Sequence, residues 1–497
     1  MKKHSKYKKQ SLAVIVACSV MTISGVEVFA ENSTQSSLSK TEVSTNIQQE
    51  HQSDTLENRV FEVKGKGDVQ ILRSKERKQF SFSPYEPTGL YAKPNEKITI
   101  YVEGNQNIQA YIGTCSYDGA WNEDYKIRSF TLVPGTNTIE SPYGGMIYFY
   151  NEQQGSIIQT RVTKGGSATP YFELEKHTKQ DLITMLNQYP DAHAVELKGE
   201  RVLITASPAR VKKYLLGSNT DPVQLLRKMD EATRVQDKIS GLSEEQVDKH
   251  YVHYVEDNHG EGYMYAFPHR TAYIGDAIQH VLDFDKFTND GWGPWHEAGH
   301  LRQQEPWKFH NMTEVQVNLY SLAVEKAFGH PSRLETEKDN NKTGYERAFE
   351  YLDKPDIDKD YDKIEDLFVK LVMLWQLHLA YGEEFYPTLH QQYRDMPNNE
   401  LPTTDEYKKQ LFMIEASKAA QQNLLPFFEQ WGLKPNQDTI QKITQLGYQI
   451  LVDPIWKSTD SNPVKPSNEV LVPPTDLHAL GTTVTSVDLK WTAPTGN

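Results

Sequence analysis

Cysteine is almost absent from this chain, whose 497 residues include only Cys18 and Cys115. Cys18 lies in an N-terminal segment that we expect to be removed, so Cys115 remains alone and has no partner for an internal disulfide. This shortage excludes a small disulfide-stapled fold. In an exported chain, as the N-terminus indicates, the lack of disulfides is more typical of a Gram-positive bacterium than of a eukaryotic extracellular domain.

Long apolar runs and an excess of basic charge are also missing. Beyond the N-terminal segment no stretch reaches the roughly 18 consecutive apolar residues of a membrane-spanning helix, so no membrane span is expected. Without residues 1–30 the chain has 48 Lys and Arg against 66 Asp and Glu, a formal net charge of −18. This balance argues against binding to nucleic acid or to an anionic membrane through bulk charge.

The N-terminus has the pattern of a secretory signal peptide. Five lysines within residues 2–9 precede an apolar segment, Leu12–Val26, and Ala30 supplies the small residue that suits cleavage. We therefore expect residues 1–30 to be a signal peptide and the protein to be secreted, either into the extracellular medium or onto the cell surface. The segment before Cys18 loosely resembles a lipoprotein cleavage box, but the apolar run continues well past it, which makes lipidation the less favoured alternative.

The most informative stretch is Gly291–Asn318, which contains the H-E-x-x-H sequence His296-Glu297-Ala298-Gly299-His300. Residues four apart on a helix share a face, so His296 and His300 can direct two imidazoles at one metal ion. Glu297 lies close enough to act as a general base on a water activated by that metal. A catalytic zinc ion has three protein ligands and a water, so a third ligand is expected further along the chain.

Glu314 is the candidate third ligand. It begins a second predicted helix, for which Thr313 is the expected N-cap, and the 13 residues between His300 and Glu314 leave room for a loop and a return. A three-histidine pattern fails, because Gln303 stands where a glycine is needed and Pro306 where the third histidine would be.

Other side chains near the motif compete for supporting roles. Glu305 is expected to be too close along the motif helix to reach the metal, and Glu325 is expected to be solvated. His310, in the connecting loop, remains an alternative ligand. Asn318, one turn after Glu314, is the candidate for orienting a ligand.

Oxyanion stabilisation and sugar stacking each have several candidates, between which the sequence does not choose. For each histidine before the motif, a surface position or a satisfied core position is the simpler interpretation. The tryptophans near the motif either stack on sugar rings or pack in the core, and core packing is favoured. The candidates for oxyanion stabilisation are His250, His253, His259, His269, Tyr263 and Tyr265, and those for stacking are Trp292, Trp295 and Trp307.

The N-terminal part of the chain predicts a linker and a β-domain. Residues 31–56 are rich in Ser, Thr and Gln and poor in apolar residues, which favours a disordered linker. Residues 57–165 contain short alternating or apolar stretches, such as Phe80–Phe82, Lys97–Val102 and Met146–Tyr150, separated by turn signals. This pattern predicts a β-sandwich, which we expect to support the next domain rather than to contact glycans.

Residues 166–330 mix helical and strand patterns. Helices are predicted over Thr178–Leu186 and from Asp221 onward, and strands over Arg201–Thr205 and Tyr263–Phe267. Strands and helices that lead into an H-E-x-x-H helix have the order of a zincin-like catalytic domain.

Residues 331–456 predict a helical subdomain. Asp366–Tyr381 is apolar enough for a buried helix and too short to span a membrane. Further helices are predicted over Asp405–Gln422, Leu424–Gly432 and Gln437–Leu451.

The C-terminal part predicts a linker and a module fragment. Residues 457–471 have the Pro and Ser content of a linker. Residues 472–497 resemble the first strands of a fibronectin type III domain, whose complete sandwich takes about 100 residues, so we expect a truncated module. The predicted fold class is therefore multidomain α+β, with an N-terminal β-sandwich, a zincin-like catalytic domain, a helical subdomain and a fibronectin type III fragment.

The sequence around the motif closely resembles the M60-like (enhancin-like) metallopeptidase family. The resemblance lies in Gly291–Gln304, with a glycine before the second histidine, and in Thr313–Leu322, which holds Glu314. Pro87–Pro94 is similar to the family's N-terminal start and Phe427–Gly432 to its helical tail, so about residues 80–435 are covered. The resemblance implies a zincin of the gluzincin type, with one zinc ion held by His296, His300 and Glu314 and with Glu297 as general base.

The resemblance also implies a function. Family members of this kind are secreted or surface proteins of host-associated bacteria and viruses that cleave mucins and other O-glycosylated proteins. We therefore expect a zinc-dependent endopeptidase of a Bacillus-like bacterium that binds O-glycosylated protein and carbohydrate and acts as a monomer. One alternative is a glycan-binding adhesin with a structural or inactive zincin domain, against which the intact Glu297 argues, since a structural zinc site needs no base. A general metallopeptidase indifferent to glycans remains equally compatible with the sequence.

Overall fold

The computed structural model describes residues 59–467, 475–482 and 486–492. The predicted signal peptide at 1–30 and the predicted linker at 31–56 lie outside these residues. Among the described residues, no helix combines the length and the apolar character needed to cross a membrane.

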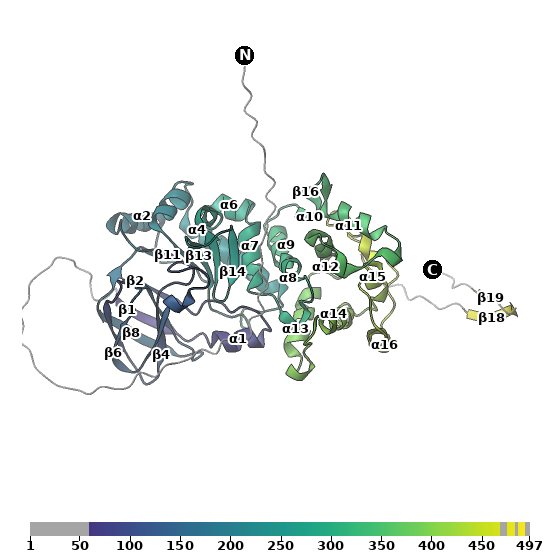
Figure 1. Cartoon of the computed structure of the whole chain (residues 1–497), viewed down its shortest axis with the longest axis horizontal. Helices are drawn as coiled ribbons and strands as arrows, with labels where there is room; N and C mark the ends of the chain where they lie inside the picture. The colour runs from purple at the N-terminus through teal and green to yellow at the C-terminus, as the bar shows by residue number, and fades with distance from the viewer. Residues whose placement is uncertain (1–58, 468–474, 483–485, 493–497) are drawn as a thin grey trace, which may run out of the picture. The chain divides into compact units, whose positions relative to one another are not determined.

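Two antiparallel sheets enclose the core of the N-terminal part (Figure 1). Alternating residues of both sheets, such as Ile98, Ile100 and Phe149, meet between them and are fully buried. The first sheet has the order β1 (Val60–Lys64), β8 (Ile157–Lys164), β3 (Lys97–Val102) and β6 (Gly135–Glu140). The second has the order β5 (Arg128–Leu132), β4 (Ile108–Ile112), β7 (Gly145–Tyr150), β2 (Glu86–Ala92) and β9 (Ser167–Ala168).

Strand β7 is buried on both faces, which explains its uninterrupted apolar sequence. Ile147 and Phe149 face the core between the two sheets, whereas Met146 and Tyr148 pack against the sheet of the following part of the chain. The strand predicted at Phe80–Phe82 is wrong. This segment is an extended connection, and Phe82 is buried because it packs against the sheet of the following part of the chain.

A six-stranded mixed sheet organises the part of the chain that carries the motif. Its order is β10 (Tyr171–Glu173), β11 (Val195–Lys198), β12 (Val202–Ala206), β13 (Val252–Asp257), β15 (Arg270–Ile274) and β14 (Met264–Phe267). Strand β14 forms one edge and runs antiparallel to β15. Side chains of β12 alternate, so that Val202 and Ile204 face the helices while Leu203 faces the N-terminal sheets.

Helices α4 (Pro222–Ile239) and α7 (Trp292–His300) cover the face of this sheet that points away from the N-terminal sheets (Figure 1). Asp221 caps α4 by accepting a hydrogen bond from Val223 N, and Pro222 occupies the first helical position, as predicted. The predicted helix at 178–186 is also present as α2 (Lys179–Gln188), with Thr178 in a capping box. The mixed α+β class is therefore confirmed.

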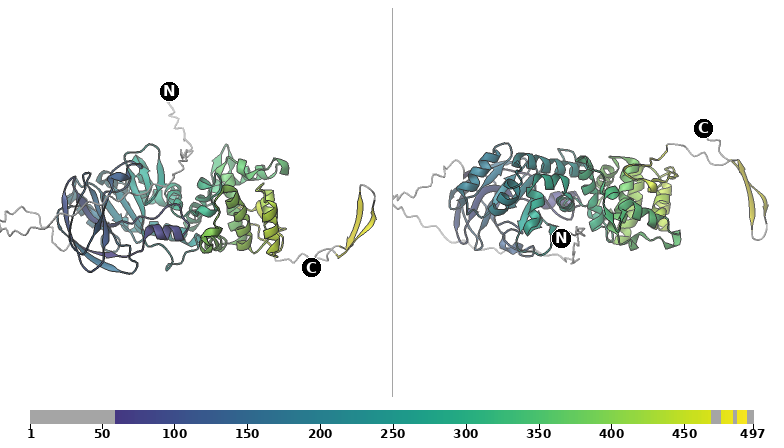
Figure 2. Two further views of the ribbon diagram at one scale, coloured as in Figure 1. Left: turned by 60° about the horizontal axis from the view of Figure 1, so that its bottom comes forward. Right: turned by 90° about the horizontal axis from the view of Figure 1, so that it is seen from above.

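The rest of the described chain is largely helical, and its helices gather around one core (Figure 2). Helix α12 (Leu367–Tyr381) is central and buried along almost its entire length, as its composition predicted. The others that form this core or flank it are α8 (Thr313–Gln316), α9 (Asn318–Ala327), α10 (Arg333–Thr336), α11 (Gly344–Leu352), α13 (Phe385–Asp395), α14 (Asp405–Ala420), α15 (Leu425–Gln430) and α16 (Gln437–Gln445). Helix α16 ends six residues before the predicted Leu451, since Gly447 adopts a positive φ of 70°.

The C-terminal part of the described chain consists of a segment without helix or strand and a β-hairpin. Residues 458–467 contain no helix or strand, yet they pack against the helices: Asp460 accepts hydrogen bonds from Tyr345 Oη at 2.7 Å and Trp375 Nε1 at 2.8 Å. Although residues 458–467 have the composition of a linker, hydrogen bonds hold this segment against the helices. Further on, β18 (Thr475–Thr482) and β19 (Val487–Thr492) form an antiparallel hairpin.

Candidate metal centre and active site

Helix α7 presents the motif from inside the fold. Eight of its nine residues are buried, because the helix lies between the six-stranded sheet and α9. A side chain at Gly291, where the helix begins, would collide with Phe287 O and with the ring of Trp295. The helix ends at His300, so both motif histidines lie on its final turns.

His296, His300 and Glu314 converge on one point. The distances are 3.1 Å between the two Nε2 atoms, 3.0 Å from His296 Nε2 to Glu314 Oε2 and 3.6 Å from His300 Nε2 to the same oxygen. In the part of the chain that the structure describes, this is the single cluster of three or more such groups whose ligand atoms are close enough to hold a metal ion. The predicted ligand set is thus brought together by α7 and α8.

Two amides fix the orientation of the imidazoles. Asn318 Oδ1 lies 2.8 Å from His296 Nδ1, and Gln303 Oε1 lies 2.7 Å from His300 Nδ1. The same amides donate through their nitrogens to the backbone oxygens of Glu314 and Thr313, which sets the position of their oxygens. An oxygen acceptor at Nδ1 places the ring hydrogen there and leaves the Nε2 lone pair directed at the centre.

Asn318 makes the contact with His296 that its predicted orienting role requires, whereas the contact of Gln303 with His300 was missed. Sequence reasoning considered Gln303 only as the wrong residue for a three-histidine pattern. Its position three residues after His300, where a turn back toward the imidazole is possible, was the available signal.

The donor set fits a divalent cation. Two imidazole lone pairs and one carboxylate oxygen face one another at short distance, and such an arrangement requires a positive charge between them. Burial alone raises the pKa of Glu314 and lowers that of His296, but their mutual contacts prevail: the pKa of Glu314 falls well below its usual range and that of His296 rises to about 9. Two nitrogen ligands and one oxygen ligand are the donors of catalytic zinc sites.

Glu297 lies beside this centre without joining it. Its Oε2 atom is 4.0 Å from His300 Nε2, and only 4% of the residue is exposed. Burial raises the pKa of its carboxyl group. A carboxylate so placed is suited to exchange a proton with a small molecule at the centre.

The competing acidic residues and His310 lie elsewhere. Glu305 does not continue α7 but belongs to the next short helix, Glu305–Trp307, where it pairs with Lys308. His310 is exposed and faces Asp405. The expectation that Glu325 is solvated is wrong, because it is buried and accepts a hydrogen bond from Arg333 N at 2.8 Å.

Thr313 does not cap the helix of Glu314. It is the first residue of α8, and the capping position falls on Met312, which makes no side-chain cap. The backbone nitrogens of Val315 and Gln316 bond instead to Met312 O.

The oxyanion candidates are engaged in other contacts. Met264 of β14 lies against α7, where a side chain at Gly293 would meet its sulfur, so Tyr265 points to the opposite face and donates to Asp257. Tyr263 Oη bonds His280 Nε2 at 2.5 Å. The histidine partners are Asp248 for His250, Thr205 for His253, Tyr117 O for His259 and Ser81 for His269.

The three tryptophans near the motif are core residues. Trp292, Trp295 and Trp307 are 8%, 3% and 0% exposed and belong to the hydrophobic cores. The core-packing interpretation is confirmed, and stacking of these rings on sugars is excluded in this conformation.

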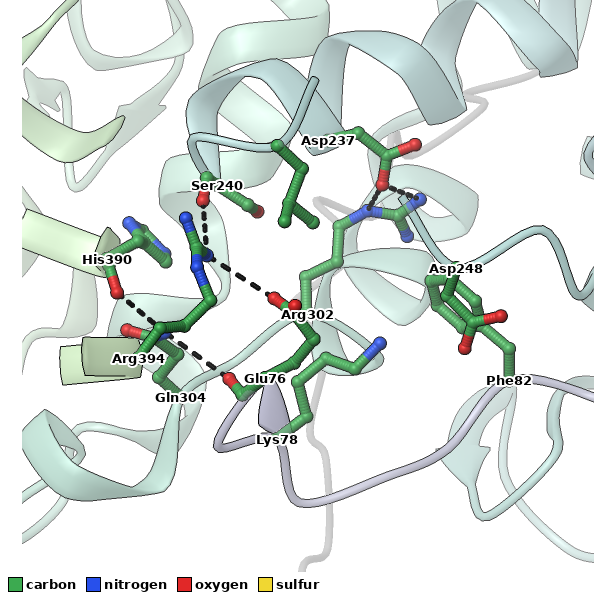
Figure 3. Close-up of a pocket in the computed structure, with 11 residues that line it drawn as sticks. Glu76, Lys78, Phe82, Asp237, Ser240, Asp248, Arg302, Gln304, His390 and Arg394 are labelled. Atoms are coloured by element: carbon green, nitrogen blue, oxygen red, sulfur yellow. Dashed lines mark hydrogen bonds and ion pairs between the residues drawn. The ribbon is translucent and has the colours of Figure 1, made fainter. Parts of the chain in front are cut away.

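Behind the motif helix, charged side chains fill a small cavity (Figure 3). Arg302, two residues after His300, pairs with Asp237 of α4 at 3.1 Å and donates to Ala298 O at 3.2 Å. On the other side of the cavity Arg394 of α13 pairs with Glu76 at 3.3 Å. The Arg302–Asp237 pair anchors the end of α7 to α4, and the Arg394–Glu76 pair joins α13 to the N-terminal part of the described chain.

A mixed sheet with an antiparallel edge strand, an H-E-x-x-H helix packed against it and a glutamate from the next helix form the kind of site that metallopeptidases use. The comparisons with known proteins agree. Residues 165–432 match the family described as peptidase M60, enhancin and enhancin-like, and residues 55–163 match the N-terminal domain of M60-like peptidases. The chain belongs to the M60 peptidase family.

Solved structures and curated relatives extend this result. A functionally unknown conserved protein from Bacillus anthracis str. Ames is 46% identical, with 84% of each chain covered and a TM-score of 0.77. The M60 catalytic domain of ZmpC from Clostridium perfringens, solved with the sialyl T antigen, shares the fold at 21% identity, with 87% of this chain and 88% of that one covered and a TM-score of 0.66. TRPM8 channel-associated factor 1 from Bos taurus is 27% identical over 62% of this chain, which spans about a third (32%) of that relative.

Proposed function

We propose that this protein is a secreted zinc-dependent endopeptidase that hydrolyses peptide bonds in mucin-type O-glycosylated proteins. The observation that carries the proposal is the convergence of His296, His300 and Glu314 at 3.0–3.6 Å with Glu297 beside them. The proposal includes removal of residues 1–30, a monomeric protein of a Bacillus-like bacterium, and the predicted domains 57–165, 166–330, 331–456 and 472–497.

The chemistry follows from the positions of these side chains. His296, His300 and Glu314 would hold a zinc ion, which supplies Lewis-acid activation of a water and of the substrate carbonyl. Glu297 takes a proton from the attacking water on its carboxylate and delivers it to the nitrogen of the leaving amine. Asn318 and Gln303 keep the two imidazoles in their tautomers throughout.

Edge strand β14 offers a place for the substrate backbone. Within the described residues it pairs with β15 on one side, and its other edge has no partner strand. Met264 at one end of β14 touches the beginning of α7. A peptide segment that adds to this edge would therefore pass beside the motif helix.

The choice of a glycosylated substrate is supported by the relative from Clostridium perfringens, whose structure contains the sialyl T antigen. Two alternatives from the sequence compete with it, a non-catalytic glycan-binding adhesin and a peptidase indifferent to glycans. The curated relatives named as channel-associated factors make the first alternative worth testing directly.

The test uses the zinc-loaded protein with an O-glycosylated mucin and with the same mucin after removal of its glycans. We expect chelator-sensitive cleavage of the glycosylated form alone. Cleavage of both forms at equal rates would support the glycan-indifferent peptidase, and binding without cleavage would support the adhesin.

The matched control is Glu297→Gln, which removes the base and preserves the size of the side chain. We expect it to retain one zinc ion per chain and to lose about 10²–10⁴-fold in rate. His296→Ala, in contrast, should lose the zinc ion, as measured by elemental analysis. Wild-type rates in Glu297→Gln would show that the base is another residue.

A further inference from the structure

Exposed aromatic side chains concentrate at one end of the N-terminal sheets. Among the residues that the structure describes, five aromatic side chains are exposed: Tyr101, Trp121, Tyr125, Tyr143 and Tyr407. Trp121 (47% exposed) and Tyr125 (60%) lie in the connection between β4 and β5, and Tyr143 (42%) lies in the turn before β7. The rings of Tyr125 and Tyr143 are in contact, with centroids 6.4 Å apart. We call Trp121, Tyr125 and Tyr143 the aromatic patch.

The loop that carries the patch is held by a buried arginine. Arg270, the first residue of β15, is fully buried and binds both carboxylate oxygens of Asp124, at 2.8 and 3.0 Å. It also donates to Trp121 O at 3.3 Å and to Ser116 Oγ at 2.9 Å. Because a two-pronged arginine–carboxylate contact restricts the loop, the exposed rings are held in place before any ligand arrives.

The patch is continuous with the substrate edge of the proposed active site. The ring of Trp121 packs edge-on against Phe267 at 5.8 Å. Phe267 is the last residue of β14, and Met264, the first, lies against the motif helix. Four residues of extended chain span about 10 Å, so a substrate that follows β14 from the motif helix reaches the patch within a few residues.

We propose that the aromatic patch binds a sugar of the glycoprotein substrate, attached a few residues from the bond that is cut. This inference rests on the proposed function and adds a glycan site on the N-terminal domain. The proposal differs from the sequence-based expectation that this domain only supports the next one.

The composition of the patch favours a sugar over an apolar protein segment. A pyranose ring has a face of C–H groups that packs against an aromatic face and a rim of hydroxyl groups that needs polar partners. Asp124 and Lys126 lie between and beside the exposed rings, and the Arg128 guanidinium lies 5.4 Å from the centroid of Tyr143. A site for an apolar peptide would require exposed aliphatic side chains. Within residues 116–128 no large aliphatic side chain is exposed.

The test compares two synthetic mucin-type glycopeptides with the zinc-loaded protein, one with a single O-glycan next to the cleaved bond and one with a second O-glycan a few residues away. We expect the second glycan to lower KM about tenfold, which corresponds to one or two stacking contacts. Trp121→Ala and Tyr125→Ala should remove this advantage while kcat, and KM for the peptide with one glycan, stay at wild-type values. Trp121→Phe should restore part of it, and Tyr101→Ala, which removes an exposed ring outside the patch, should leave it unchanged.

Binding is measured separately from cleavage in the Glu297→Gln protein, by calorimetry with the same glycopeptides and with the peptide without sugars. If Trp121→Ala weakens binding of the doubly glycosylated peptide in this background, the inference is supported. This holds even if the wild-type protein cleaves none of the peptides, because the absence of cleavage would overturn only the proposed function. Equal binding with and without Trp121, or equal loss of binding for the sugar-free peptide, would overturn the inference.

Discussion

Two amide side chains orient the imidazoles of the proposed zinc site. Asn318 and Gln303 each accept from the Nδ1 atom of one motif histidine, at 2.8 and 2.7 Å. Without such an acceptor an imidazole can change its tautomer or rotate, and the Nε2 lone pair is then no longer directed at the candidate metal centre. Partners of this kind therefore contribute to affinity without touching the metal.

We predict that Asn318→Ala weakens zinc binding about 10–100-fold, because the tautomer of His296 is no longer fixed. Competition with a fluorescent zinc chelator measures this change. Asn318→Asp keeps an oxygen acceptor at the same position and serves as the control, with a much smaller loss. Equal losses in the two variants would contradict an orienting role.

Glu196 is a buried acidic residue whose protonation state depends on the fold. It is fully buried between the six-stranded sheet and the N-terminal sheets. Burial raises the pKa of its carboxyl group to about 8, although hydrogen bonds from Tyr148 and Thr205 act to lower the pKa. The folded protein therefore holds a proton that the unfolded chain releases near pH 4.5. Since the folded state binds more protons in this range, stability falls as pH rises from about 4.5 to 8.

Glu196→Gln removes this titration and preserves the shape of the side chain. We predict that the wild-type protein loses about 2–3 kcal/mol more stability between pH 5.5 and 8 than the variant does. Urea unfolding at the two pH values measures the difference. His253, whose pKa burial lowers to about 3, is present in both proteins, so its contribution cancels in the comparison. The same pH dependence in both proteins would show that Glu196 is ionised when folded.

At the scale of elements, the crossing of α7 and α9 sets the distance between the motif and its third ligand. A methyl group at Gly299 would lie 3.0 Å from Val317 Cγ2, 3.1 Å from Val317 O and 3.2 Å from Tyr320 Cβ. Val317 joins α8 to α9, and Glu314 lies on α8, so any displacement at this contact moves Glu314 relative to the histidines.

We predict that Gly299→Ala weakens zinc binding about tenfold while changing the stability of the metal-free protein by less than about 1 kcal/mol. Alanine favours a helix by about 1 kcal/mol over glycine, which offsets the cost of the tight contact. Zinc titration and urea unfolding of the metal-free protein measure the two quantities. Ala298→Gly, its neighbour on the same helix, should lower stability instead and leave zinc affinity less affected.

Elements with a strong local signal were predictable from the sequence, and those fixed by distant contacts were not. The caps at Thr178 and Asp221 and the apolar run of α12 identify helices correctly, because their causes lie within a few residues. Phe80–Phe82 alternates like a strand, but Phe82 is buried because it packs against the six-stranded sheet, whose strands lie far along the chain. The motif spacing indicated the three side chains that converge at the candidate metal centre. The contact of Gln303 with His300 depends on the turn that ends α7, and a spacing of three residues shows only that such a contact is possible.

At the scale of the whole described chain, buried ion pairs join parts that are distant in sequence. Asp237 of α4 forms ion pairs with Arg201 before β12 and with Arg302 after the motif helix, at 3.0 and 3.1 Å. Glu86 of β2 pairs with Lys66 at 2.9 Å and with Lys198 of β11 at 2.5 Å. Such pairs cost desolvation, and their loss is expensive because the remaining charge stays buried.

Arg394 of α13 is the clearest case, because it joins the helical part to two earlier elements. Its guanidinium pairs with Glu76 after α1 (Val69–Lys75) and donates to Ser240 O and Gly241 O at the end of α4, at 2.7 and 2.9 Å. We predict that Arg394→Met costs about 3–5 kcal/mol, since Glu76 and two carbonyl oxygens lose a buried partner. The matched control is Lys238→Met, which breaks an exposed pair with Glu383 at 2.7 Å between the same regions and should cost less than about 1 kcal/mol. Urea unfolding followed by tryptophan fluorescence measures both, and equal costs would mean that the joint depends on apolar packing rather than on the buried charge.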